Sequence, residues 1–174
     1  MKNDIRGFTL IELLVSVFVI ALISGIVLAN LRSGGNNSQL KTAAQKVASD
    51  IRLAQNYSLS YKDFNGADSN GGWGVYFNTG ASSRYVIFAD QNKNKLYNSS
   101  TSEGYATINL PDNISIDSLS LGTRVDIVFL PPDPITFINS SNSTPVEIVL
   151  MGQGGQRIKV SVNPWGLVSV GSIY

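Results

Sequence analysis

One apolar stretch near the N-terminus constrains this chain more than any other feature. Residues 8–31 contain a single charged side chain, Glu12, among residues that are otherwise apolar or small and polar. As an α-helix this stretch is about 36 Å long, which is enough to cross the hydrocarbon of a bilayer with some tilt. The sequence therefore predicts a membrane-spanning helix at residues 8–31, preceded by a short polar leader at residues 1–7.

Two ordinary kinds of N-terminal segment explain this stretch incompletely. The run is longer than the apolar part of a secretory signal peptide, and no pair of small residues closes it as a cleavage site. A simple membrane anchor explains the length, and Lys2 and Arg6 then place the N-terminus in the cytoplasm. An anchor does not explain Glu12, because an ionised carboxylate is costly in hydrocarbon. We therefore expect this acid to have a function.

The composition excludes several classes of protein. The chain has 13 Lys and Arg against 12 Asp and Glu, so it has no broad electrostatic attraction to nucleic acid or anionic lipid. It contains no cysteine and no histidine, which excludes disulfides, thiolate nucleophiles and the commonest general base and metal ligand. No nucleophile–base pair stands out, and the glycine clusters lack the lysine of a phosphate-binding loop. The sequence predicts no enzyme, no cofactor and no metal.

The remainder of the chain predicts a soluble domain at residues 32–174. Paired glycines and asparagines at residues 33–37 predict a break in the helix. A second, amphipathic helix is expected at about residues 38–59, because apolar residues recur there at steps of three and four. These apolar positions are Leu40, Ala44, Val47, Ile51 and Ala54.

Short runs rich in β-branched and aromatic residues follow, separated by turn residues. They predict strands at residues 73–77, 84–89, 105–110, 114–121, 125–130, 135–139, 146–151, 157–162 and 167–170. The regular spacing favours an antiparallel sheet in two packed layers. The predicted fold class is α+β, with a long N-terminal helix, one half membrane-spanning and the other amphipathic, packed on an antiparallel β domain.

The first residues of the apolar stretch carry a family resemblance. Residues 7–14, GFTLIELL, resemble the class III signal of type IV pilins and pseudopilins. The resemblance implies that prepilin peptidase cuts between Gly7 and Phe8 and that Phe8 becomes the N-methylated first residue. It also gives Glu12 a role in assembly, since its carboxylate can neutralise the new α-amino group of a neighbouring subunit as the helices stack. An unpaired charge in the wrong register is strongly penalised.

A second resemblance covers nearly the whole chain. The stretches AAQKVASDIRLAQNYSLS, YVIFADQNKNKLYN, VFLPPDPITF and RIKVSVNPWGLVSV resemble GspH/FimT-type minor pseudopilins, the second of them at that family's D-x-N-x-N turn. This implies a structural subunit of a type II secretion pseudopilus or a type IV pilus, assembled near the fibre tip. It would be held in the bacterial inner membrane by one span, with its N-terminus cytoplasmic and its C-terminal domain extracytoplasmic. The implied partners are prepilin peptidase and other pilins or pseudopilins.

Two alternatives remain open at this point. One is a FimT-like minor pilin that binds DNA during natural transformation, for which Arg157 and Lys159 near Trp165 and Tyr174 are the candidate contacts. Two cations beside aromatic residues make only a small phosphate-binding surface, and an exposed strand face explains them equally simply. The other alternative is a major pilin, which the absence of cysteines disfavours, because many major pilins close a C-terminal loop with a disulfide.

Two further patterns were weighed for binding. Ala21, Gly25 and Ala29 recur every fourth residue, which is typical of a helix face that packs closely on another helix. Asp90, Asn92 and Asn94 match the first half of an EF-hand-like calcium loop. The second half does not match, because Lys95 and Thr101 stand where that loop has Gly and Glu. A polar turn capped by Asx hydrogen bonds is the interpretation we prefer for this loop.

Overall fold

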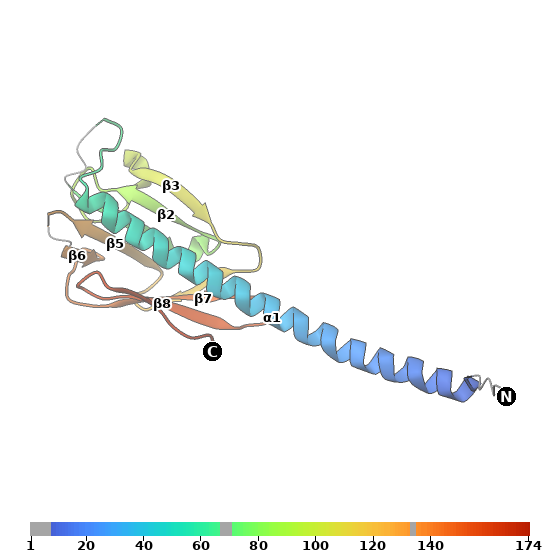
Figure 1. Ribbon diagram of the computed structural model, residues 1–174. Helices are drawn as coiled ribbons and strands as arrows, with labels where there is room; N and C mark the ends of the chain where they lie inside the picture. The colour runs from blue at the N-terminus through green and yellow to red at the C-terminus, as the bar shows by residue number, and fades with distance from the viewer. Residues whose placement is uncertain (1–7, 67–70, 133–134) are drawn as a thin grey trace. The chain divides into compact units, whose positions relative to one another are not determined.

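The computed structural model describes residues 8–66, 71–132 and 135–174, and their side chains apart from those of residues 28–34. The chain divides into two compact units, Met1–Asn36 and Asn37–Tyr174. The first unit contributes the N-terminal part of one helix. The second unit contains the rest of that helix and all the described strands (Figure 1). The predicted division into a leader at residues 1–7, a membrane-spanning segment at residues 8–31 and a soluble domain at residues 32–174 stays a prediction.

Helix α1 runs from Leu10 to Leu59, so the predicted break at residues 33–37 is wrong. Glycine in a helix costs about 1 kcal/mol relative to alanine, and this cost alone does not end a helix. Extending an existing helix adds one hydrogen bond for each residue fixed, whereas starting a new helix is unfavourable. The weak segment is therefore bridged by the stronger helix-forming sequence on both of its sides.

The strands of the second unit form two antiparallel sheets. The first sheet has the order β3-β2-β1-β5-β6 and the second has the order β4-β7-β8-β9. The strands are β1 Trp73–Asn78, β2 Arg84–Ala89, β3 Gly104–Asn109, β4 Ser115–Leu119, β5 Arg124–Leu130, β6 Ile135–Ile138, β7 Val146–Met151, β8 Arg157–Val162 and β9 Val168–Val170. Two short 3-10 helices, η1 Thr79–Ala81 and η2 Ser99–Thr101, lie in the connections. All nine predicted strands are present with ends shifted by at most a few residues, and the predicted α+β class is confirmed.

Inward-facing residues of both sheets form one core, and burial alternates most clearly along β7 and β8. On β1, Trp73, Val75 and Phe77 are fully buried and belong to the same apolar cluster as the inward residues of β7 and β8. Residues at every second position of a strand share a face, which explains why this face is apolar. The cluster also includes, from the second sheet, Ile116, Leu119, Val146, Ile148, Leu150, Ile158, Val160, Val162 and Val168.

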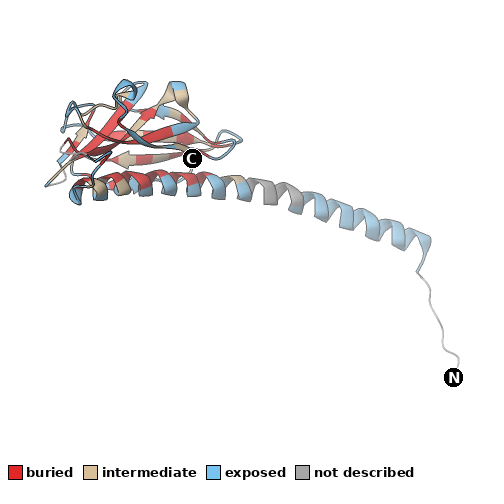
Figure 2. Cartoon of the chain, turned by 90° about the horizontal axis from the view of Figure 1, so that it is seen from above, coloured by how far each residue is buried: buried red, intermediate tan, exposed pale blue. Residues whose placement is uncertain are grey.

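The C-terminal half of α1 covers this core with a face of mostly small residues. Figure 2 shows the buried stripe of the helix turned toward the sheets. Its fully or nearly buried apolar residues are Leu40, Ala43, Ala44, Val47, Ala48, Ile51 and Ala54. The alanines leave room for the helix backbone to lie close to the strands. The predicted amphipathic helix at residues 38–59 is therefore present, as part of α1.

Three side-chain hydrogen bonds fix the helix to strands of both sheets. The Tyr85 hydroxyl of β2 donates to Asp50 Oδ2 over 2.6 Å, and the Ser58 hydroxyl donates to the Phe129 carbonyl of β5 over 2.5 Å. Arg52 Nη2 donates to the Val168 carbonyl of β9 over 2.8 Å. Apolar packing alone is not directional, so these bonds set the position of the helix along the sheets.

Candidate functional site

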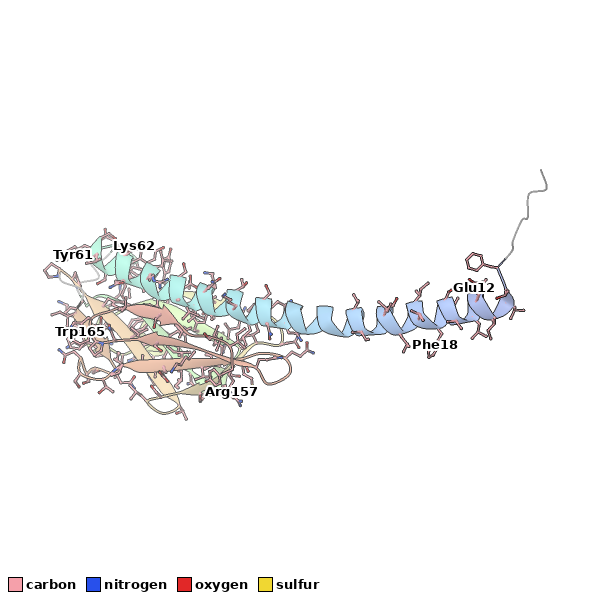
Figure 3. The ribbon with its side chains drawn as sticks, turned by 60° about the horizontal axis from the view of Figure 1, so that its bottom comes forward. Glu12, Phe18, Tyr61, Lys62, Arg157 and Trp165 are labelled. Carbon is pink, nitrogen blue, oxygen red and sulfur yellow. The ribbon has the colours of Figure 1, made fainter. Side chains whose placement is uncertain are left out.

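The N-terminal half of α1 is an apolar helix with no core of its own. The described residues contain one stretch long and apolar enough to cross a membrane, Leu10–Val27, with a mean hydropathy of 2.7. None of this stretch is buried inside the protein. Leu10, Ile11 and Phe18 expose 84%, 68% and 62% of their surface, and Figure 3 shows Phe18 projecting from the helix. Such a surface requires an apolar environment, either lipid or other protein.

Glu12 lies in the first turn of this apolar helix. Its backbone N–H donates to the Thr9 hydroxyl over 3.3 Å, so Thr9 supplies the cap that starts the helix. The Glu12 carbonyl accepts from the Ser16 hydroxyl one turn later, over 2.7 Å. A carboxylate in the first turn interacts favourably with the helix dipole. No ion pair between described residues involves Glu12, so its charge is available to a group from outside the described part of this chain.

The other residues predicted to act in the helix are placed only in part. Phe8 precedes the helix and is 80% exposed. Ala21 and Gly25 are exposed on α1, and a methyl group built on Gly25 would meet no atom within 4 Å. Gly7 lies outside the described residues, and so does the side chain of Ala29. Cleavage, methylation and close helix packing at these positions stay predictions.

The two candidate DNA contacts lie on the outer face of the second sheet, each beside a carboxylate. Arg157 Nε is 2.8 Å from Asp117 Oδ2, and Lys159 Nζ is 2.8 Å from Glu147 Oε1. The hydrogen bond that Arg157 donates to Asp117 raises the pKa of Arg157, and the bond that Lys159 donates to Glu147 raises the pKa of Lys159. These ion pairs reduce the positive charge that a phosphate would meet. DNA contact at this face stays a prediction.

The aromatic residues near these cations in the sequence are separated by the fold. Tyr174 exchanges two backbone hydrogen bonds with Arg157, of 2.9 and 3.0 Å, and is therefore its neighbour. Trp165 is 83% exposed and lies toward the end of the second unit where Tyr61 and Lys62 also lie, away from Arg157 (Figure 3). No aromatic and basic cluster forms from all four predicted residues.

An aromatic cluster around Lys62, just beyond the end of α1, was not predicted from the sequence. The Lys62 ammonium lies 3.7 Å from the ring centre of Tyr57 and 4.3 Å from that of Tyr105, and it donates to the Tyr105 hydroxyl over 3.0 Å. The Trp73 indole N–H donates to the Lys62 carbonyl over 2.9 Å. The hydrogen bond with Tyr105 raises the pKa of Lys62. Because its members come from three separate segments, no local pattern predicts this cluster, which ties the end of α1 to the first sheet.

Comparison with known protein families decides the class of this chain. The family described as "Prokaryotic N-terminal methylation motif" matches residues 2–28. The family described as "Type II transport protein GspH" matches residues 43–166, which is more than half of the chain. The chain belongs to the GspH family. No curated relative and no solved structure matches it.

The GspH assignment confirms the resemblance seen in the sequence. GspH is a family of structural pseudopilins and not of enzymes. This GspH chain is a minor pseudopilin or pilin of a type II secretion system or a type IV pilus. The methylation motif implies processing by prepilin peptidase and assembly with other pilins. The exposed apolar helix suits a pilin anchored in the inner membrane.

Proposed function

We propose that this chain is a minor pseudopilin that is cut between Gly7 and Phe8, methylated at Phe8 and assembled near the tip of a secretion fibre. Before assembly it spans the inner membrane once, with its N-terminus in the cytoplasm and residues 32–174 outside. The observation that carries the proposal is the exposed apolar half of α1 with one acid in its first turn. An exposed apolar helix is unfavourable on a domain surrounded by water, whereas a fibre held together by its N-terminal helices requires one.

The position of Glu12 suggests what its charge does during assembly. Cleavage after Gly7 creates an α-amino group on Phe8, which is a second costly charge in or near hydrocarbon. Pairing the Glu12 carboxylate with the amine of a neighbouring subunit converts two isolated charges into one ion pair. A subunit in the wrong register leaves a charge unpaired, and an uncompensated buried charge costs about 3–5 kcal/mol. Glu12 therefore selects the register of stacking and is not a catalytic group.

The small residues of the helix favour close contact with the same neighbours. Ala21 and Gly25 are exposed, and a helix backbone can approach closely where side chains are this small. Packing between helices in a membrane depends on such contacts, because lipid tails are as apolar as leucine side chains. The apolar face thus supplies attraction, and Glu12 supplies the register.

Replacing Glu12 with glutamine tests the proposal. Glu12→Gln keeps the shape and removes the charge, so insertion and cleavage should proceed, since the peptidase acts at the Gly7–Phe8 junction. Mass spectrometry of the membrane form should show methylated Phe8 as the first residue in both the natural and the variant chain. The variant should be at least about 10-fold depleted from sheared fibres and from cross-linked pseudopilin complexes, given the cost of an unpaired charge.

A matched variant separates charge from shape. Glu12→Asp keeps the charge on a shorter side chain and should assemble better than Glu12→Gln. If the Glu12→Gln variant entered fibres at the natural level, the proposed role of Glu12 in assembly would be refuted. Retention of residues 1–7 in a strain with active prepilin peptidase would overturn the processing step. Binding of DNA by fibres that contain the chain would instead support the FimT-like alternative.

A further inference from the structure

The connection between β2 and β3 is held by buried carboxylates. Asp90 and Glu103 lie at its two ends, Asp126 lies on β5 beneath it, and all three side chains belong to fully buried residues. Asp90 accepts from the backbone N–H groups of Asn94 and Lys95, over 3.1 and 2.8 Å. Asp126 accepts from the Tyr97 N–H over 2.7 Å and is paired with Arg124. These bonds make the loop a polar turn closed by side-chain oxygens, as the sequence predicts.

The backbone of this loop follows the conformation of a calcium loop more closely than its sequence indicates. The side-chain oxygens of Asn92 and Asn94 each accept from the N–H two residues later, over 3.0 and 2.8 Å. Lys93 and Lys95 both have φ of +62°, although the sixth position of a calcium loop is normally glycine. Lys95 adopts this conformation despite its side chain. Its ammonium lies 4.1 Å from the ring centre of Phe137, so it is engaged on β6.

Glu103 supplies the observation that points to a ligand. Its Oε2 accepts from the Asn98 N–H over 2.9 Å, which directs the carboxylate to the loop. Its Oε1 is buried and has no hydrogen-bond partner among the described residues. Burial raises the pKa of Asp90, and the negative charge of Glu103 raises it further. No ion pair between described residues compensates either charge.

We propose that Asp90 and Glu103, with the amide oxygens of Asn92 and Asn94, bind one calcium ion. Two carboxylates match the charge of a divalent cation, and every donor is an oxygen, as Ca²⁺ prefers. The chain has no cysteine or histidine, so softer metals lack their usual ligands. The described residues contain no group of three acidic side chains that could hold a metal ion, so the proposed site depends on amide oxygens and water for its remaining ligands. Glu103 replaces the acid that position 101 lacks.

Calcium binding would join the two ends of this connection. Asp90 follows β2, and Glu103 directly precedes β3, the edge strand of the first sheet. An ion shared by both would hold the loop and the edge strand in one arrangement. Sites of low charge on extracellular modules bind Ca²⁺ with dissociation constants of about 0.1–1 mM, and we expect this range here. This inference is independent of the proposed role of Glu12.

Thermal unfolding of the full chain in detergent, stripped with EGTA, tests the site. Adding CaCl₂ to about 100 times the dissociation constant should raise the Tm by roughly 5–10 °C. MgCl₂ at equal ionic strength should do less, because Mg²⁺ demands a regular octahedron and gives up water reluctantly. Calorimetric titration with CaCl₂ should show one ion bound per chain.

Variants assign the effect to the proposed ligands. Glu103→Gln should weaken the calcium response at least about 10-fold, while the metal-free variant gains stability because the repulsion with Asp90 is gone. Asn92→Ala removes an exposed proposed ligand, which also accepts from the Asn94 N–H over 3.0 Å, so it should weaken the calcium response at the cost of one loop hydrogen bond. Glu147→Gln, which changes a carboxylate on the second sheet, should leave the calcium response of the Tm unchanged. The proposal would be overturned if 10 mM CaCl₂ left the Tm of the natural chain unchanged. It would also be overturned if only acidification raised the Tm, because Asp90 and Glu103 would then share a proton and not a calcium ion.

Discussion

Removing one buried hydroxyl group tests how the helix is fixed to the first sheet. Tyr85 is 1% exposed, and its hydroxyl donates to Asp50 Oδ2, which also belongs to a buried residue. In Tyr85→Phe the ring still packs on Phe77, and the Asp50 carboxylate loses one of its two partners among the described residues and keeps the ion pair with Lys46. A hydrogen bond to a charged group contributes about 1.5–3 kcal/mol. We expect the variant to lose about 2 kcal/mol of unfolding free energy at pH 7.

The same variant has a distinctive dependence on pH. Burial raises the pKa of Tyr85 well above its usual value, and the hydrogen bond to Asp50 raises it further. Above about pH 10 the unfolded chain releases this proton and the folded chain keeps it, so the folded state binds more protons and loses stability as pH rises. This loss is about 1.4 kcal/mol per pH unit. Phenylalanine has no proton to lose, so the difference in unfolding free energy between the natural chain and Tyr85→Phe should be about 1.4 kcal/mol smaller at pH 11 than at pH 7.

Denaturant unfolding of the full chain in detergent at pH 7, 9 and 11 measures both effects. Tyr174→Phe is the matched control, because Tyr174 is 66% exposed and should change stability by less than about 0.5 kcal/mol. Asp50→Asn combined with Tyr85→Phe should lose less than the sum of the single losses, since both remove the same bond. Equal stability of Tyr85→Phe and the natural chain at pH 7 would refute the role of this bond. A difference that stays constant up to pH 11 would refute the titration argument.

Two glycine substitutions should have opposite effects. In Gly74→Ala the new methyl carbon would lie 2.4 Å from the Ile127 carbonyl oxygen and 2.9 Å from the Phe88 ring, so we expect a loss of about 1–3 kcal/mol in the same unfolding measurement. In Gly35→Ala the methyl group meets nothing within 4 Å, and the helix should gain about 1 kcal/mol. Amide exchange around residue 35 should then slow about 5-fold, whereas unchanged exchange would contradict a continuous helix at this position.

The strands were predictable because each is a short apolar run with its own turn residues. On β7 and β8 every second residue is buried, and this period identifies both the strand and its inward face. The continuation of α1 through residues 33–37 was not predictable from the same rules, because Gly and Asn there predict a break although they impose only a local cost. Whether a helix continues depends on the strength of the segments on both sides, which lies beyond a local window.

The candidate sites divide in the same way. Glu12 was predicted as a functional residue, and stays a prediction, because an acid within so long an apolar stretch is rare enough to be informative in isolation. Glu103 was missed because it lies two residues beyond the position that a calcium loop assigns to its last acid, and only the fold shows that its side chain turns inward. The cluster around Lys62 depends on the pairing of strands, which brings Trp73 and Tyr105 together from different parts of the chain. Long-range register is what sequence patterns do not supply.

The distribution of charge explains why recognition by this subunit should depend on its helix. In the second unit, Asp117, Asp126 and Glu147 are paired with basic residues of the same unit, so these charges are satisfied internally. Glu12 has no such partner among the described residues and is surrounded by exposed apolar side chains. Pairing with an isolated charge in an apolar environment gains more binding free energy than contact with a surface ion pair, because an unpaired charge there carries a large desolvation cost. Selection of neighbouring subunits is therefore expected at Glu12, where a mismatch is costly, and not on the ion-paired face of the second sheet.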